Sequence, residues 1–193
     1  DVAEPKLIEK YIDRLEKLNA YTEDKYILCY STYIQIDKNG NDISGASKGI
    51  QFNLEETLGY TFIRNYISTS GVLVKKDKFL AVEGFNEKIT YSEDWDLWLR
   101  LATIGGFAYV DEPLVKIRRH GENMSSKVTT MMDAERKILK QYDIEYIKNA
   151  ILKRNLEIKQ NIVDYVSILF RLNNWEEGFL ELKKLLNKGC NFY

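Results

Sequence analysis

The sequence lacks several features that mark common protein classes. No apolar run reaches the roughly 20 residues that a helix needs to cross a bilayer. The 28 Lys and Arg residues are balanced by 29 Asp and Glu residues, so the basic excess of a nucleic-acid binder is missing. The two cysteines, Cys29 and Cys190, have no metal-ligand spacing and suit a reducing compartment as ordinary thiols. No glycine-rich phosphate loop is present.

The sequence does contain enough apolar residues for a folded core. Of its 193 residues, 45% are hydrophobic and 12% aromatic. At this length folding buries roughly 70% of the unfolded chain's surface, so no disulfide or metal is needed to hold the fold. The polar start, Asp1–Pro5, has no initiator methionine and no signal-peptide character. We therefore expect this chain to be an excised piece of a longer protein.

Strands and helices are mixed over the first 125 residues. Apolar runs bounded by turn signals predict the strands, and apolar residues recurring at three and four positions predict the helices. A polar, glycine- and serine-bearing loop is expected over 42–53. Helices are expected at 5–15, 54–67, 75–80 and 93–103, and strands at 26–30, 33–36, 70–74, 107–110 and 113–120.

The rest of the chain has a different character. From residue 126 onward proline is absent and the apolar spacing is helical throughout. Helices are expected at 126–142, 144–155, 157–171 and 174–187. The fold class predicted for the chain is α+β, with a mixed sheet and flanking helices in residues 1–125 and an all-helical C-terminal subdomain in residues 126–193.

The helix that begins at Glu93 carries the most informative pattern. Its apolar residues cover two adjoining faces, Leu97, Trp98 and Leu101 on one, and Trp95, Leu99 and Ala102 on the other. A helix of this kind is buried on two sides. Ser92 is expected to cap it, and Asp96 and Arg100 are spaced to form an ion pair.

Two adjacent carboxylates, Glu93 and Asp94, nevertheless open this helix. Acidic residues favour helix N-termini because the macrodipole and the free N–H groups stabilise negative charge, which is a purely structural explanation. Alternatively, one carboxylate held ionised by that terminus faces a cleft as a general base. The spacing alone leaves both interpretations open.

Four motifs in order resemble the family 2 glycosyltransferases, which have the GT-A fold. In that family, four features follow one another along the chain. They are a strand of small residues, a Gly-Phe turn followed by an acidic residue, an acidic pair that opens a helix, and an Arg-x-His stretch with a nearby Ser. The matching stretches here are Ser70–Val72, Gly84–Glu87, Glu93–Arg100 and Arg118–Ser125. The resemblance covers about residues 1–125.

The resemblance implies roles for particular residues. Asp94 matches the family's catalytic base, which takes a proton from the acceptor hydroxyl as that oxygen attacks the anomeric carbon of the donor and inverts its configuration. Glu93 would orient the acceptor, and Ser70 and Gly71 would line the substrate. Trp95, although such residues are usually core, would stack on a sugar face if it lies near the mouth of the site.

The resemblance also implies a diphosphate and metal region. His120, the only histidine, would complete the shell of a divalent metal, and Arg118 would balance phosphate charge. A lone histidine at a strand end is equally often a surface residue. The metal, Mn²⁺ or Mg²⁺, is held in the family by an Asp-x-Asp motif, and Asp1 matches the position just after it. We therefore expect the metal to belong to the longer enzyme, with none bound by this chain.

The resulting function is that of an inverting glycosyltransferase. Its partners would be a nucleotide-sugar donor and a glycan or lipid-linked acceptor, with no nucleic acid, and the isolated chain is expected to be inactive. We expect a cytoplasmic protein, and leave open attachment to the inner face of the membrane and formation of a homodimer through an exposed strand edge. One alternative is a non-catalytic helical interaction module. The other is a nucleotidyltransferase of related fold, which the Glu93–Asp94 motif fits less well.

Overall fold

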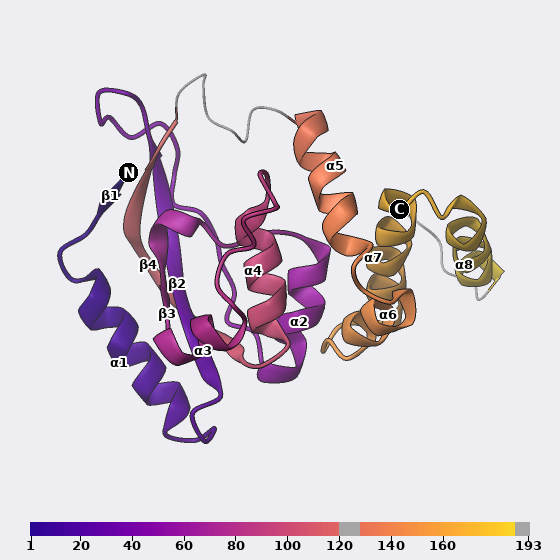
Figure 1. Cartoon of the computed structure of the whole chain (residues 1–193), viewed down its shortest axis with the longest axis horizontal. Coiled ribbons are helices and arrows are strands. Elements are labelled where there is room, and N and C mark those ends of the chain that lie inside the picture. The colour runs from indigo at the N-terminus through magenta and orange to yellow at the C-terminus, as the bar shows by residue number, and fades with distance from the viewer. Residues whose placement is uncertain (120–127, 188–193) are drawn as a thin grey trace.

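The structure, a computed structural model, describes residues 1–119 and 128–187 (Figure 1). It is α+β, as predicted: a mixed four-stranded sheet is flanked by helices and followed by further helices. The strands are β1 (Val2–Ala3), β2 (Tyr26–Ile36), β3 (Val72–Val74) and β4 (Gly106–Arg118). The helices that accompany them are α1 (Leu7–Asn19), α2 (Leu54–Ile63), α3 (Lys76–Ala81) and α4 (Glu93–Ala102). The later helices are α5 (Val128–Leu139), α6 (Ile144–Leu152), α7 (Ile158–Arg171) and α8 (Trp175–Asn187).

The sheet has the order β1-β4-β2-β3. The two long strands, β2 and β4, run parallel, whereas β1 pairs with β4 and β3 pairs with β2 in the antiparallel sense. The long strands are continuous where the sequence suggested two shorter ones each. The β2–β4 ladder shifts register where Thr32 faces Pro113 and Tyr33 faces Val115, so β4 accommodates Pro113 at an irregularity instead of ending there.

Helices cover both faces of the sheet. On one face α1 buries Leu7, Tyr11 and Leu15 in a cluster with strand residues that include Cys29 and Ala108. On the other face α4 packs in a second cluster with residues of β2 and β4, and Figure 1 shows the sheet standing between α1 and the pair α2 and α4. The helical spacing thus predicted the buried face of α1 only in part, because Ile8 and Ile12, which share that spacing, are exposed.

Helix α4 is buried on two sides, as the sequence predicts. Leu97, Trp98 and Leu101 face the sheet cluster, and Trp95 and Leu99 face a cluster formed with the C-terminal helices. The predicted pair is also present: Asp96, only 1% exposed, accepts hydrogen bonds from Arg100, with Arg100 Nη2 at 2.7 Å from Oδ2. The prediction that the Ser92 side chain caps α4 is wrong.

The residue before α4, Ser92, makes no side-chain cap. Its backbone is left-handed, with φ of 58°, and its hydroxyl contacts the sulfur of Met131 at 3.8 Å. Helix α2 also differs from the prediction, because it ends at Ile63 and Arg64 is extended. The chain after Arg64 is therefore free to run toward the N-terminus of α4.

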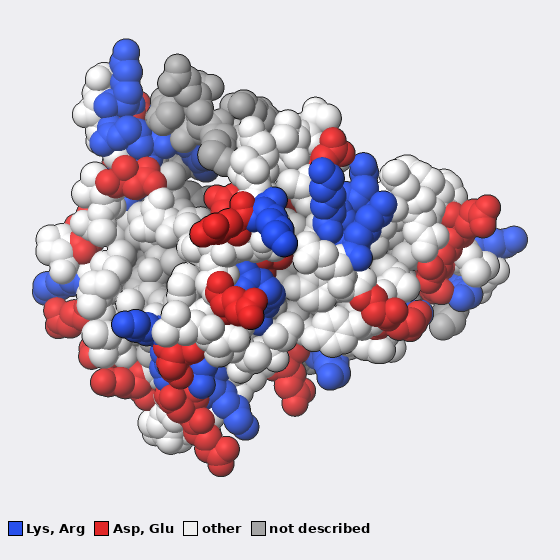
Figure 2. All heavy atoms as spheres, in the orientation of Figure 1, with Lys and Arg blue, Asp and Glu red and all other residues white. Residues whose placement is uncertain are grey.

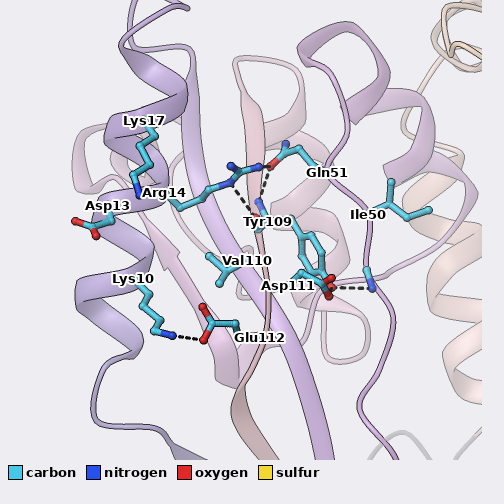
Figure 3. A pocket seen from close by; sticks show the side chains of 11 residues that line it. Lys10, Asp13, Arg14, Lys17, Ile50, Gln51, Tyr109, Val110, Asp111 and Glu112 are labelled. Atoms are coloured by element: carbon cyan, nitrogen blue, oxygen red, sulfur yellow. Dashed lines mark hydrogen bonds and ion pairs between the residues drawn. The ribbon is translucent and has the colours of Figure 1, made fainter.

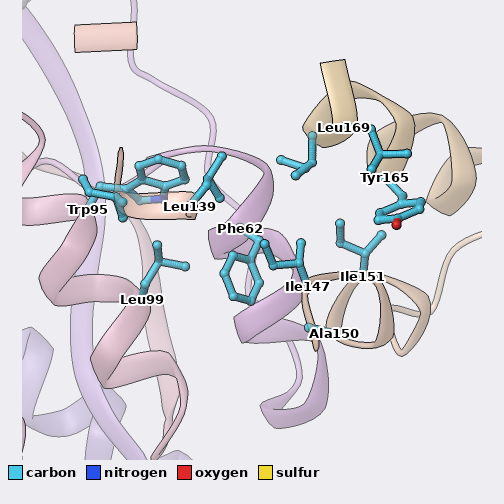
Figure 4. Close-up of a cluster of buried hydrophobic side chains, with 11 residues drawn as sticks. Phe62, Trp95, Leu99, Leu139, Ile147, Ala150, Ile151, Tyr165 and Leu169 are labelled. Atoms are coloured by element: carbon cyan, nitrogen blue, oxygen red, sulfur yellow. The ribbon is translucent and has the colours of Figure 1, made fainter. Parts of the chain in front are cut away.

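The C-terminal helices share a core with α2 and α4 (Figure 4). Phe62 of α2 and Trp95 of α4 lie in one cluster with residues of α5, α6 and α7. The helices approach closely, since a Cβ at Gly59 in α2 would lie 2.4 Å from the carbonyl oxygen of Ala150 in α6. The predicted boundary near residue 125 falls within 120–127, outside the described residues.

Candidate functional site

The carboxylate of Asp94 lies at the N-terminal end of α4 and is held on both oxygens. Oδ1 accepts a hydrogen bond from Asn65 Nδ2 at 3.0 Å, and Oδ2 accepts one from Thr69 Oγ1 at 2.7 Å. The backbone N–H of Trp95 also donates to Oδ1, at 2.7 Å. Three hydrogen bonds of this kind hold the carboxylate in a fixed orientation.

The helix that carries Asp94 is anchored at its first turn. Trp95 is fully buried, and its Nε1 donates to the backbone carbonyl of Thr61 at 2.6 Å. Its ring therefore lies in the core, as is usual for such residues, and the condition for stacking on a sugar at the mouth of a site is not met. Glu93, next to Asp94, is partly exposed, and its side chain makes no hydrogen bond to any described residue.

A second cluster lies where β1 meets β4. Asp1 precedes the residue that pairs with Lys116, so its carboxylate lies beside the end of β4. Its Oδ1 accepts from the backbone N–H of Arg118 at 2.6 Å, and its Oδ2 accepts from the hydroxyl of Ser70. The guanidinium of Arg118 donates from Nη1 to the carbonyls of Asp37 and Lys38, both at 2.8 Å.

One short turn joins the two clusters. Residues Thr69–Gly71 form a single 3-10 turn before β3. Thr69 donates to Asp94, and the next residue, Ser70, donates to Asp1. Gly71 is buried against β4, where an added Cβ would lie 2.5 Å from Val115 Cγ2. The predicted residues Asp94, Ser70, Gly71 and Arg118 are therefore gathered around this turn.

Two contributors to this arrangement were missed from the sequence. Asn65 and Thr69 contact Asp94, although neither belongs to the motifs that indicated the site. The hydroxyl-rich run Ser68–Ser70 before a strand was the available signal for Thr69. The predicted metal ligand, His120, lies outside the described residues.

A small hollow lies next to Asp94. Its volume is about 170 Å³, and Asn65, the donor to Asp94, is one of its lining residues. The other lining residues are Tyr30, Ser31, Tyr33, Ser47, Lys48, Gly49, Arg64 and Tyr66. Asp94 itself does not line this polar hollow, which is of the size of one sugar ring, and is connected to it through the side chain of Asn65.

A larger hollow, of about 700 Å³, lies between α1 and the outer edge of β4 (Figure 3). Several of its polar groups are already engaged with each other. Lys10 pairs with Glu112, and Arg14 donates to the carbonyl of Tyr109 and to Gln51 Oε1, at 3.0 and 3.1 Å. Gln51 also bonds both to Tyr109 N and to the Phe107 carbonyl, and so covers this strand edge. We assign this hollow a structural role.

No cluster of metal-ligating side chains occurs in the described residues: they contain no group of three or more His, Cys, Asp or Glu residues arranged to hold a metal ion. Both oxygens of Asp1 are already bonded to Ser70 and Arg118, and a hard cation needs several oxygen or nitrogen donors at once.

Two surface properties complete the description. Figure 2 shows acidic and basic side chains interspersed over the visible face, in keeping with the formal net charge of −1. Among residues 1–119 and 128–187, no helix has both the length and the apolar character needed to span a membrane.

Comparison with known proteins points to glycosyl transfer. No family model matches the chain. It is 29% identical to an uncharacterized glycosyltransferase of Haemophilus influenzae over 180 residues, which cover 88% of this chain and 51% of that protein. It is 27% identical to the chondroitin synthase of Escherichia coli over 128 residues, which cover 66% of this chain and 17% of that protein.

A third similarity comes from an archaeon. The chain is 31% identical to an uncharacterized glycosyltransferase of Methanocaldococcus jannaschii over 119 residues, which cover 61% of this chain and 39% of that protein. The chain spans between about a sixth and a half of the length of these three relatives. These similarities support a glycosyltransferase family.

Proposed function

We propose that this chain carries the general base of an inverting family 2 glycosyltransferase of the GT-A fold, and that the base is Asp94. The observation that carries the proposal is the environment of the Asp94 carboxylate. The carboxylate is fixed on both oxygens by Asn65 and Thr69 and lies at a helix N-terminus, and Asn65 also lines a polar hollow. The glycosyltransferase relatives support the reaction class.

The proposed reaction is a single displacement. The acceptor hydroxyl oxygen forms a bond to the anomeric carbon of a nucleotide-sugar while the bond from that carbon to the diphosphate oxygen breaks. The acceptor proton passes to Asp94, and the diphosphate leaves with the bonding electron pair. Positioning of the base by Thr69 and Asn65 is the contribution of this chain. A divalent metal that neutralises the leaving group stays a prediction from the resemblance.

Replacing Asp94 by Asn in the intact enzyme tests the assignment. Asparagine keeps the shape, and its Oδ1 can still accept from Asn65 and Trp95 N while its Nδ2 donates to Thr69 Oγ1. It cannot accept the proton, so transfer should fall by roughly 10²–10⁴-fold. Transfer from a panel of nucleotide-sugars is followed by chromatography, and the melting temperature shows whether the fold survives. Asp77→Asn, an exposed acid on α3, is the matched control. Full activity in Asp94→Asn would refute the proposal.

We further propose that the 193-residue chain alone does not transfer sugar. The support is the short span of the chain relative to its glycosyltransferase relatives and the lack of a metal-binding cluster in its described residues. Titration with UDP-sugars and Mn²⁺ by calorimetry should give no specific heat. Micromolar binding would contradict this.

A stripe on α8 favours the alternative role as an interaction module. Trp175, Phe179, Leu182 and Leu186 are spaced by four, three and four residues on one helix face, and three of them are more than half exposed. If this stripe binds a second copy of the chain, the protein sediments as a dimer and Phe179→Glu sediments as a monomer. A wild-type protein that sediments as a monomer would exclude binding of a second copy through this stripe.

A further inference from the structure

The hollow next to Asp94 has an unbalanced charge. Two of its lining residues, Lys48 and Arg64, are cationic, and none is acidic. Neither cation has an ion-pair or side-chain hydrogen-bond partner in the part of the chain that the structure describes. In the larger hollow beside α1, by contrast, acidic residues also line the wall and Lys10 pairs with Glu112. A local positive field on a nearly neutral protein favours an anionic ligand.

The loop that carries Lys48 is held on both sides of that residue. Ser47 N donates to the carbonyl of Tyr33 at 2.8 Å, and Ser47 Oγ accepts from Tyr33 N at 2.9 Å. Gly49 N donates to the hydroxyl of Tyr109 at 3.0 Å. A Cβ at Gly49 would lie 2.3 Å from the Tyr109 ring, so glycine permits this close approach. The backbone of Lys48 is thus fixed beside the hollow, which lowers the entropy lost on binding.

Aromatic rings form part of the wall of the same hollow. The rings of Tyr30 and Tyr66 lie 5.6 Å apart, and the hydroxyl of Tyr30 donates to the carbonyl of Ile50 at 2.8 Å. Burial raises the pKa of both tyrosines well above the ordinary value, so they stay neutral. Tyr33 adds a third ring to the lining. Aromatic faces beside a few polar groups suit a sugar ring, which has both apolar C–H faces and hydroxyls.

The hollow also has contact with the residues around the 3-10 turn. Its lining residue Asn65 donates to Asp94, and its lining residue Ser31 accepts from the hydroxyl of Tyr11 at 2.7 Å. The same Tyr11 hydroxyl lies 2.9 Å from the carbonyl oxygen of Gly71. A ligand in this hollow would therefore contact Asn65, the residue that holds the proposed base.

We propose that this hollow is the acceptor subsite and that it takes a saccharide bearing an anionic group, a carboxylate or a phosphate, which Arg64 and Lys48 bind. The inference rests on the proposed function, because it takes Asp94 to be the base that faces the acceptor. Arg64 offers a planar fork of donors that matches either anion, and Lys48 adds a point charge. The acid group thus selects the acceptor and holds its hydroxyl near Asp94.

Binding to the chain itself tests the proposal without any transfer reaction. The probes are methyl β-D-glucuronide, α-D-glucose 1-phosphate and the neutral methyl β-D-glucoside. Each is titrated into the ¹⁵N-labelled chain while the amide signal of Gly49 is followed by NMR. The variants are Arg64→Gln and Lys48→Gln, and the control is Lys76→Gln, an exposed lysine on α3 that does not line the hollow.

We expect at least one charged probe to bind about tenfold more tightly than the neutral glucoside, and each Gln variant to lose most of that difference. The Lys76→Gln control should bind as the wild type does. A preference for the glucuronide assigns an acidic saccharide, and a preference for the phosphate assigns a phosphorylated one. Equal binding of all probes, no binding, or binding unchanged in both Gln variants would overturn the proposal. Because the readout is binding, such a result is separate from the activity of Asp94→Asn.

Discussion

The hydroxyl of Thr69 donates to Oδ2 of Asp94 at 2.7 Å across 25 positions of sequence. This contact connects the turn before β3 to the first residues of α4. The other oxygen, Oδ1, already accepts from Asn65 and Trp95 N. The hydrogen bond from Thr69 to Oδ2 therefore determines which lone pairs of the carboxylate remain available to accept a proton. Thr69 is therefore a positioning residue for the proposed base.

Thr69→Val in the intact enzyme should lower kcat by roughly 10–100-fold, since a hydrogen bond to a charged group is worth about 1.5–3 kcal/mol. Valine keeps the shape but cannot donate. The KM for the donor should stay unchanged, and Thr69→Ser should restore most of the rate because it keeps the hydroxyl. Equal losses in the valine and serine variants would show that the methyl group matters and the hydrogen bond does not.

Gly71→Ala should destabilise the chain by about 1–3 kcal/mol, because the new methyl group would overlap Val115 Cγ2 at 2.5 Å. Urea unfolding followed by circular dichroism gives the free energy of unfolding. The same substitution in a Val115→Ala background should cost clearly less, since the space it needs is then open. Additive effects of the two substitutions would argue against this contact.

Trp95 and Trp98 offer a matched pair. Trp95 Nε1 donates to the carbonyl of Thr61, whereas Trp98 Nε1 is buried with no partner among the described residues. Both side chains are buried, and replacement by Phe deletes the same atoms from each. Trp95→Phe should therefore cost about 1–3 kcal/mol more than Trp98→Phe in unfolding free energy. A larger loss for Trp98→Phe would contradict the assigned hydrogen bonding.

Stability should fall at alkaline pH. Burial raises the pKa of the Cys29 thiol from 9.0 to about 12 and that of the Tyr142 hydroxyl from 10.0 to about 12. The folded state thus keeps protons that the unfolded chain releases, so this stability is complete below pH 9 and is lost as pH rises toward 12. Urea unfolding at pH 8 and pH 10.5 measures the loss. Tyr142→Phe should show a smaller drop over that interval.

Much of the fold follows from apolar spacing. The 3.6-residue period located α1, α4 and the C-terminal helices, and it divided the residues of α4 between two clusters almost as the structure does. Ala102 is the exception, since it packs with the sheet side. Periodicity succeeds here because each face meets a continuous apolar surface.

Other features depended on contacts that periodicity does not record. Pro113 lies inside β4 because the ladder with β2 shifts register there, which requires the partner strand to be known. Thr69 and Asn65 reach Asp94 only through the fold. That the side chain of Arg64 has no ion-pair partner among the described residues becomes evident only once its neighbours are placed. The motif indicated Asp94 but neither of the side chains that hold it, Asn65 and Thr69.

The shared core of α2, α4 and the C-terminal helices has a consequence for engineering. Exchanging residues 128–187 for those of a relative would replace the residues of α5, α6 and α7 that share a cluster with Phe62, Trp95 and Leu99. The tilt of α4 would then change without any substitution near the hollow, and the orientation of the Asp94 carboxylate would change with it. Chimeras that aim to alter acceptor choice should therefore move α2 and α4 together with the C-terminal helices as one unit.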